Sequence, residues 1–162
     1  METRRPRENG DDPDAGPREN PEARPRVRVN PVPGADGACH HPVAMSATIL
    51  MVDDHAGFRE RARVLLEAEG YDVVGEAADG QSGIEAARRL RPDLALVDIG
   101  LPDLDGFAVA ASMRASGTAG LIVLISGRDR EDFGDRVARS EADGFIAKRD
   151  LSAEHLARFL RS

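Results

Sequence analysis

Short apolar runs and longer amphipathic segments alternate along the chain from Thr48 onward. Runs such as TILMV and LIVLI carry no alternating polar residues, which is typical of strands buried on both faces of a sheet. The longer segments repeat apolar residues at helical spacing. The pattern predicts strands at Thr48–Val52, Asp72–Glu76, Leu94–Val97, Leu121–Ile125 and Gly144–Ala147, and helices at Gly57–Glu69, Gln81–Leu90, Asp105–Ala115, Asp129–Ser140 and Ser152–Arg161.

Residues that start and stop helices support these limits. Gly70 is suited to end the first helix, and Pro92 stops the second. Ser152 is a predicted N-cap of the last helix, with Leu151 and Leu156 spaced as a hydrophobic staple. Five successive βα units predict an open, doubly wound parallel sheet with helices on both faces, because five strands are too few for an eightfold barrel.

The helix predicted at Asp129–Ser140 has the weakest pattern. Its apolar residues are few, and Gly134 lies inside it, which costs about 1 kcal/mol of helix propensity relative to Ala. Segments with few buried contacts open most readily. We therefore expect this segment to exchange amide hydrogens fastest among the helices and to change most on activation.

Residues 1–44 have a different composition from the rest of the chain. They hold eight of the ten prolines, seven Arg and eight Asp or Glu, and few large apolar residues. Such a segment cannot bury enough apolar surface to offset its ordering entropy, so we predict a disordered tail at 1–44 and one folded domain at 45–162. Met45 is a candidate true start. Cys39, His40 and His41 are ligand types for zinc or copper, but without a second cluster we expect no metal there.

Composition excludes several classes of protein. No apolar run approaches the 18 residues of a membrane span, and the tail lacks the apolar region of a secretory signal, so we expect a cytoplasmic protein without membrane insertion. A single cysteine excludes a disulfide within the chain. The net charge of -7 and the pI near 5.1 argue against direct DNA binding. Among 22 basic residues, only Lys148 is a lysine.

Reactive side chains follow the predicted strands. Asp53 and Asp54 follow the first strand, Asp98 the third, Ser126 the fourth and Lys148 the fifth. The carboxyl ends of parallel strands share one edge, where ligands of open sheets bind. Carboxylates so close together repel, and Mg²⁺ relieves this repulsion, while a lysine neutralises an anionic oxygen. The combination suits phosphoryl transfer to a carboxylate. Each residue alone has a plainer reading: a turn or helix cap for the Asp pair and Ser126, and a solvated charge for Lys148.

The motifs ILMVDDH, LALVDIGLPDLDGF, LIVLISG and ADGFIAKRDLS resemble those of bacterial response-regulator receiver domains, across Thr48 to Ser162. The resemblance implies a flavodoxin-like (βα)5 fold with strand order 2-1-3-4-5. It also implies that Asp98 accepts a phosphoryl group from a phosphohistidine on a sensor histidine kinase or phosphotransfer protein. Asp54, with help from Asp53, Asp98 and the main-chain carbonyl of Gly100, would bind Mg²⁺.

The resemblance assigns roles on the phosphoryl side as well. Lys148 and Ser126 would contact the phosphoryl group, and Ser126 with Phe145 would form the switch. Phe145 lacks the hydroxyl of the tyrosine often found there. Arg149 stands where many receivers have a proline preceded by a cis peptide bond, and a trans bond is expected because cis costs a non-proline residue roughly 3 kcal/mol.

The chain ends at the close of the last predicted helix, so we expect a stand-alone receiver whose output is a downstream protein target or a phosphorelay. It would not be an enzyme beyond its own phosphorylation and dephosphorylation. Two alternatives stay open. One is a Mg²⁺-dependent phosphohydrolase using an aspartyl phosphate, although Gly100 stands where its general acid would be. The other is a pseudo-receiver binding module, against which the acidic set and Lys148 argue.

Overall fold

The structure is a computed structural model that describes residues 46–161. The predicted tail at 1–44, with Cys39, His40 and His41, lies outside the described residues. Five parallel strands form one sheet in the order β2-β1-β3-β4-β5, which confirms the predicted fold class. The strands are β1 (Thr48–Val52), β2 (Asp72–Ala77), β3 (Leu94–Asp98), β4 (Leu121–Ser126) and β5 (Gly144–Ala147).

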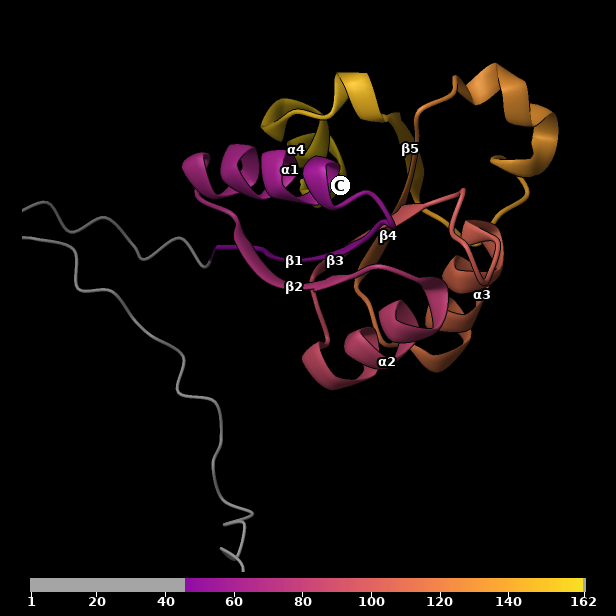
Figure 1. Ribbon diagram of the computed structural model, residues 1–162, viewed down its shortest axis with the longest axis horizontal. Helices are drawn as coiled ribbons and strands as arrows, with labels where there is room; N and C mark the ends of the chain where they lie inside the picture. The colour runs from indigo at the N-terminus through magenta and orange to yellow at the C-terminus, as the bar shows by residue number, and fades with distance from the viewer. Residues whose placement is uncertain (1–45, 162) are drawn as a thin grey trace, which may run out of the picture. The chain divides into compact units, whose positions relative to one another are not determined.

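Helices cover both faces of this sheet (Figure 1). The helical elements are α1 (Ala56–Ala68), α2 (Gly80–Leu90), α3 (Gly106–Ser116), α4 (Ala153–Leu160) and two 3-10 segments, η1 (Arg130–Arg136) and η2 (Lys148–Asp150). In Figure 1, α1 and α4 lie on one side of the strands, and α2 and α3 on the other.

Alternate residues of the central strands enter two separate cores. Leu50, Val52 and Val97 pack with residues of α2 and α3, whereas Met51 and Leu96 pack with residues of α1 and α4. All five of these side chains are fully buried. This double burial explains why the strands are continuous apolar runs.

The predicted helix ends are confirmed. Gly70 follows α1 with a φ of 88°, a left-handed conformation that favours glycine. The Ser152 hydroxyl accepts a hydrogen bond from the His155 amide at 3.3 Å and so caps α4. Leu151 and Leu156 are buried in the same core, as expected of a staple.

The helix predicted at Asp129–Ser140 is wrong in type and length. The structure has the 3-10 segment η1 at Arg130–Arg136, followed by turns, and no residue of η1 is buried. Gly134 interrupts it with φ 52° and ψ -133°, a conformation outside any helix. The chain therefore uses Gly134 to change direction, and the helical spacing of the apolar residues came from two short segments rather than one helix.

The loop after β3 is pressed against the start of α3. A Cβ atom on Gly106 would lie 2.3 Å from the main-chain oxygen of Asp98, so only glycine fits there. The Gly106 amide donates to the Ile99 carbonyl at 3.1 Å, and Asp105 caps α3 by accepting from the Phe107 amide at 3.0 Å. This close packing holds the peptide that carries Asp98 in one place.

All peptide bonds of residues 46–161 are trans, including the bond before Arg149, as expected. Across the same residues, no helix combines the length and apolarity that crossing a bilayer requires.

Candidate functional site

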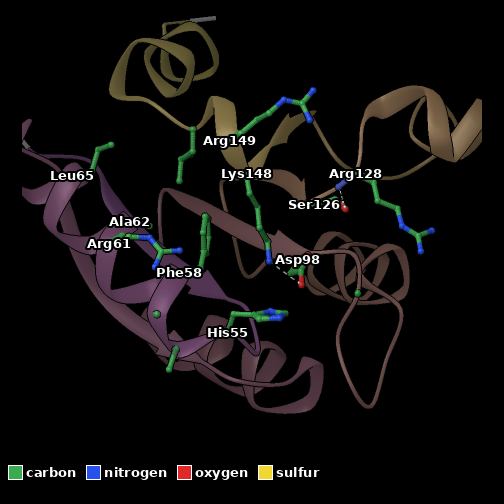
Figure 2. Close-up of a pocket in the computed structure, with 15 residues that line it drawn as sticks. His55, Phe58, Arg61, Ala62, Leu65, Asp98, Ser126, Arg128, Lys148 and Arg149 are labelled. Atoms are coloured by element: carbon green, nitrogen blue, oxygen red, sulfur yellow. Dashed lines mark hydrogen bonds and ion pairs between the residues drawn. The ribbon is translucent and has the colours of Figure 1, made fainter.

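The carboxyl ends of the central strands bring an ammonium between two buried carboxylates. Lys148 Nζ lies 2.6 Å from Asp53 Oδ2 and 3.3 Å from Asp98 Oδ2. Asp53 follows β1, Asp98 ends β3 and Lys148 follows β5, and β1 and β3 are hydrogen-bonded neighbours. Figure 2 shows the Lys148 side chain reaching down from β5 to Asp98. The structure thus brings together predicted residues from three strand ends.

Asp53 is fully buried and has two differently occupied oxygens. Its Oδ1 accepts a hydrogen bond from the His55 amide at 2.8 Å, which is the local turn that the plainer sequence reading allowed. Its Oδ2 faces the Lys148 ammonium without forming a hydrogen bond. Two buried carboxylates share this single ammonium, so the site keeps a net negative charge that favours an additional cation.

Asp98 is 4% exposed, and burial raises its pKa above the usual value. The Lys148 ammonium and the Gly100 amide act in the opposite direction, and the charge of Asp53 adds to the rise. The buried site therefore disfavours a second carboxylate charge next to Asp53. A bound cation would supply the compensation that Lys148 alone does not complete.

Ligand atoms of Asp53, Asp54, His55 and Asp98 all lie within 4.8 Å of one another. Asp54 is exposed at the surface of this group, and Asp53 and Asp98 form its floor. Three carboxylates around one point are a ligand set that suits Mg²⁺. Gly100, whose carbonyl the resemblance to receiver domains assigns to the metal, lines a cavity beside this group.

An open cavity of about 1020 Å³ lies between α1 and the ends of β3, β4 and β5, and is lined by Asp98, Ser126, Arg128 and Lys148 among others. Ser126 is the last residue of β4, and its hydroxyl accepts a hydrogen bond from the Arg128 amide at 3.1 Å. Figure 2 shows this contact at the rim of the cavity. In this state the hydroxyl stabilises a turn as an acceptor, and its own O–H is available to donate to an anion.

The structure adds three residues that the sequence reasoning missed. His55 Nδ1 lies 2.8 Å from Asp54 Oδ1. The Lys148 ammonium lies 4.8 Å from the ring centroid of Phe58, which is a cation–π contact. Arg59 donates to the main-chain oxygen of Asp53 at 2.5 Å. The only sequence signal was their position, directly after the Asp pair and within the first turn of the following helix.

Phe145 is the second residue of β5, three residues before Lys148, and packs into an aromatic cluster. Its ring centroid is 5.9 Å from that of Phe133 in η1, and Phe133 is 6.1 Å from Phe107 in α3. Arg136 covers Phe107 at 4.4 Å and pairs with Asp105 at 2.5 Å. The predicted switch residue is therefore half-buried against η1.

Comparisons with known proteins agree with this geometry. Residues 49–160 match the family model described as response regulator receiver domain. The nitrate/nitrite response regulator protein NarL of Escherichia coli is 36% identical over 115 residues, which are 70% of this chain and 53% of that protein. BvgA of Bordetella pertussis, named as a regulator of transcription of virulence factors, is 37% identical over 102 residues, 63% of this chain and 49% of BvgA.

The chain spans about half the length of these curated relatives. Among solved structures, the signal receiver domain of a NarL response regulator from Mycobacterium tuberculosis is similar with a TM-score of 0.63 at 32% identity, covering 72% of this chain and 94% of that one. The strand order, the acidic strand ends and the match over residues 49–160 lead to one conclusion: the chain belongs to the response regulator receiver domain family.

Proposed function

We propose that this protein is a phosphoacceptor of a two-component system in which Asp98 receives a phosphoryl group from the phosphohistidine of a sensor histidine kinase or phosphotransfer protein. The observation that carries the proposal is the Lys148 ammonium held between Asp53 and Asp98 at the carboxyl ends of the strands. We place this exchange in the cytoplasm, where ATP-dependent kinases act. The protein signals through its phosphorylated state rather than by turning over a substrate.

A carboxylate oxygen of Asp98 forms the new bond to phosphorus as the phosphorus–nitrogen bond of the phosphohistidine breaks. The electron pair of that bond stays on the imidazole nitrogen, which takes up a proton. Asp54, Asp53, Asp98 and the Gly100 carbonyl would hold Mg²⁺, which when bound supplies positive charge to the transferring group. Lys148 would supply a second positive charge and orient a phosphoryl oxygen.

The phosphorylated state would be read through Ser126 and Phe145. Ser126 exchanges its contact with the Arg128 amide for a hydrogen bond to a phosphoryl oxygen. This inward shift leaves room beside β4 for Phe145, which then withdraws from Phe133 and releases η1. The proposal rests on the position of Phe145, which is half-buried on β5 and packs against Phe133 of η1, a segment without buried residues.

The signal would pass to a downstream protein through the surface around η1 and β5. This chain matches about half the length of NarL, a response regulator protein, and of BvgA, a transcription regulator. The net charge of -7 favours contact with a protein over direct contact with DNA.

The test is incubation of the full chain with Mg²⁺ and acetyl phosphate, followed by intact-mass measurement. We expect the mass of one phosphoryl group to be added, to be lost at alkaline pH, and to be absent in Asp98→Asn. Continuous release of phosphate without accumulation would instead identify a phosphohydrolase. No phosphorylation by acetyl phosphate or by any histidine kinase tested would identify a pseudo-receiver binding module.

A further inference from the structure

We propose that His55 is a nitrogen ligand of the divalent cation and that it makes this site prefer first-row transition ions to Mg²⁺. The inference rests on the cation site of the proposed function and adds to it a fourth side chain with different chemistry. A ring nitrogen of His55 belongs to the group of ligand atoms that lie within 4.8 Å of one another, together with carboxylate oxygens of Asp53, Asp54 and Asp98.

The distances fit neighbouring positions around one ion. Ligands at adjacent corners of an octahedron with bonds of about 2.1 Å are roughly 3 Å apart, and opposite corners are roughly 4.2 Å apart. His55 Nδ1 is 2.8 Å from Asp54 Oδ1 and 3.5 Å from Asp53 Oδ1. These two distances lie on either side of the roughly 3 Å expected for ligands at adjacent corners. Asp53 and Asp98, the two other carboxylates of the group, are buried and share only one ammonium, that of Lys148.

Helix capping does not explain the orientation of the His55 imidazole ring. His55 is the N-cap residue of α1, with φ -87° and ψ 99°, yet its side chain makes no capping hydrogen bond. Histidine is not among the preferred N-cap residues. The ring turns instead toward the carboxylates, and 70% of the side chain is exposed, so an arriving ion can reach Nδ1. Figure 2 shows the His55 ring directed to the Asp98 end of the cavity.

Ligand chemistry sets the expected selectivity. Mg²⁺ binds oxygen ligands and gains little from an imidazole, whereas Co²⁺ and its heavier neighbours bind imidazole well. A site with three carboxylates and one imidazole therefore still holds Mg²⁺ but binds Co²⁺ more tightly. Nδ1 has to be unprotonated to act as the ligand.

The test uses the full chain with Cys39→Ser, His40→Ala and His41→Ala, because these residues are also ligand types for transition ions. Calorimetric titrations with Co²⁺ alone and with Mg²⁺ alone compare this protein with His55→Ala. We expect His55→Ala to weaken Co²⁺ binding roughly tenfold and Mg²⁺ binding less than about twofold. Circular dichroism melts establish that each variant is folded.

Two control variants frame the result. His155→Ala removes the other histidine of residues 46–161, which contacts the Asp150 carbonyl and Ser152, and is expected to leave both affinities unchanged. Asp54→Ala is expected to weaken the binding of both Co²⁺ and Mg²⁺. Pulsed electron paramagnetic resonance with Mn²⁺ provides a direct signature, since nitrogen coupling should be present and should vanish in His55→Ala.

Equal loss of Mg²⁺ and Co²⁺ binding in His55→Ala, or no loss of either with no nitrogen coupling, would overturn the nitrogen ligand and leave the acidic site in place. A parent protein that binds neither ion would instead remove the cation site itself, and with it the proposed function.

Discussion

The two ends of the proposed switch are built in different ways. The acidic end, made of Asp53, Asp54 and Asp98, stands on β1 and β3, whose central residues are fully buried. The responding end, made of η1 and Phe145, has a segment with no buried residue and a backbone interrupted at Gly134. In Figure 1, η1 lies at the rim beside β5, beyond the layered helices.

The difference assigns rigidity and motion to separate regions. Buried parallel strands hold charged groups at fixed distances, which a metal and a transferring phosphoryl group require. A segment held by three aromatic rings and a few surface ion pairs can change its arrangement at low cost. One of these ion pairs joins Arg149 to Asp129, and another joins Arg136 to Asp105. In the proposed switch, the acidic site therefore stays in place while η1 responds.

The largest expected effects distinguish the metal-binding role of Asp54, in the acidic end, from the phosphoryl-binding role of Lys148 beside it. Asp54→Ala should lose both metal binding and phosphorylation by acetyl phosphate, because it removes a charged ligand. Lys148→Ala should still bind Mg²⁺ but respond poorly to phosphorylation, because its ammonium pairs with the phosphoryl group and not with the metal. Calorimetry and intact-mass measurement check both variants. Unchanged phosphorylation in Asp54→Ala, or loss of metal binding in Lys148→Ala, would contradict these roles.

The aromatic cluster should carry much of the stability of η1. Phe133→Ala removes two ring contacts and should cost about 2 kcal/mol of unfolding free energy, less than for a fully buried Phe because Phe133 is half-buried. Urea unfolding measures this cost. Hydrogen exchange should show faster exchange in 129–140 and little change in β1 and β3. Protection lost equally throughout the sheet would mean that the two ends are not separate.

The substitution Gly134→Ala distinguishes the predicted helix from the observed kink, because the two conformations predict stability changes of opposite sign. In a helix, Gly134→Ala would stabilise the protein by about 1 kcal/mol. At the observed φ of 52° and ψ of -133°, we expect Gly134→Ala to destabilise it by roughly 1–2 kcal/mol. Gly57→Ala is the control, since Gly57 lies in α1 with ordinary φ and only the Arg61 side chain near its Cβ position. That variant should be neutral or slightly stabilising in urea unfolding.

The smallest effect concerns the charge of Asp98 without metal. Because burial raises its folded-state pKa, the protein binds this proton more tightly when folded, and stability falls as pH rises from 3.8, the usual pKa, through the folded value. Asp98→Asn should therefore raise Tm at pH 7 in EDTA by a few degrees, since roughly 1 kcal/mol moves Tm by about 4 °C. The gain should shrink toward pH 4. A lower Tm at pH 7 would show that the Lys148 pair outweighs burial.

The sequence by itself determined the order of the βα units, the caps at Gly70 and Ser152, and the residues at the strand ends. These features depend on local periodicity and on the chemistry of single side chains, which a linear pattern records. Even so, the acidic site could be predicted only as an edge shared by strands. Its distances required the register of β1, β3 and β5.

Tertiary structure alone decided how η1 folds, where Phe133 packs and where the rings of His55 and Phe58 turn. The packing of Phe133 and Phe58 depends on partners far away in the chain: Phe133 on Phe107 and Phe145, and Phe58 on Lys148. The His55 ring, in contrast, turns toward the adjacent Asp54. Helical spacing around Gly134 could not reveal its left-handed backbone, because glycine populates both signs of φ. Contacts between distant segments are absent from local patterns, so the sequence located the acidic site, and packing placed the Phe58 ring against Lys148.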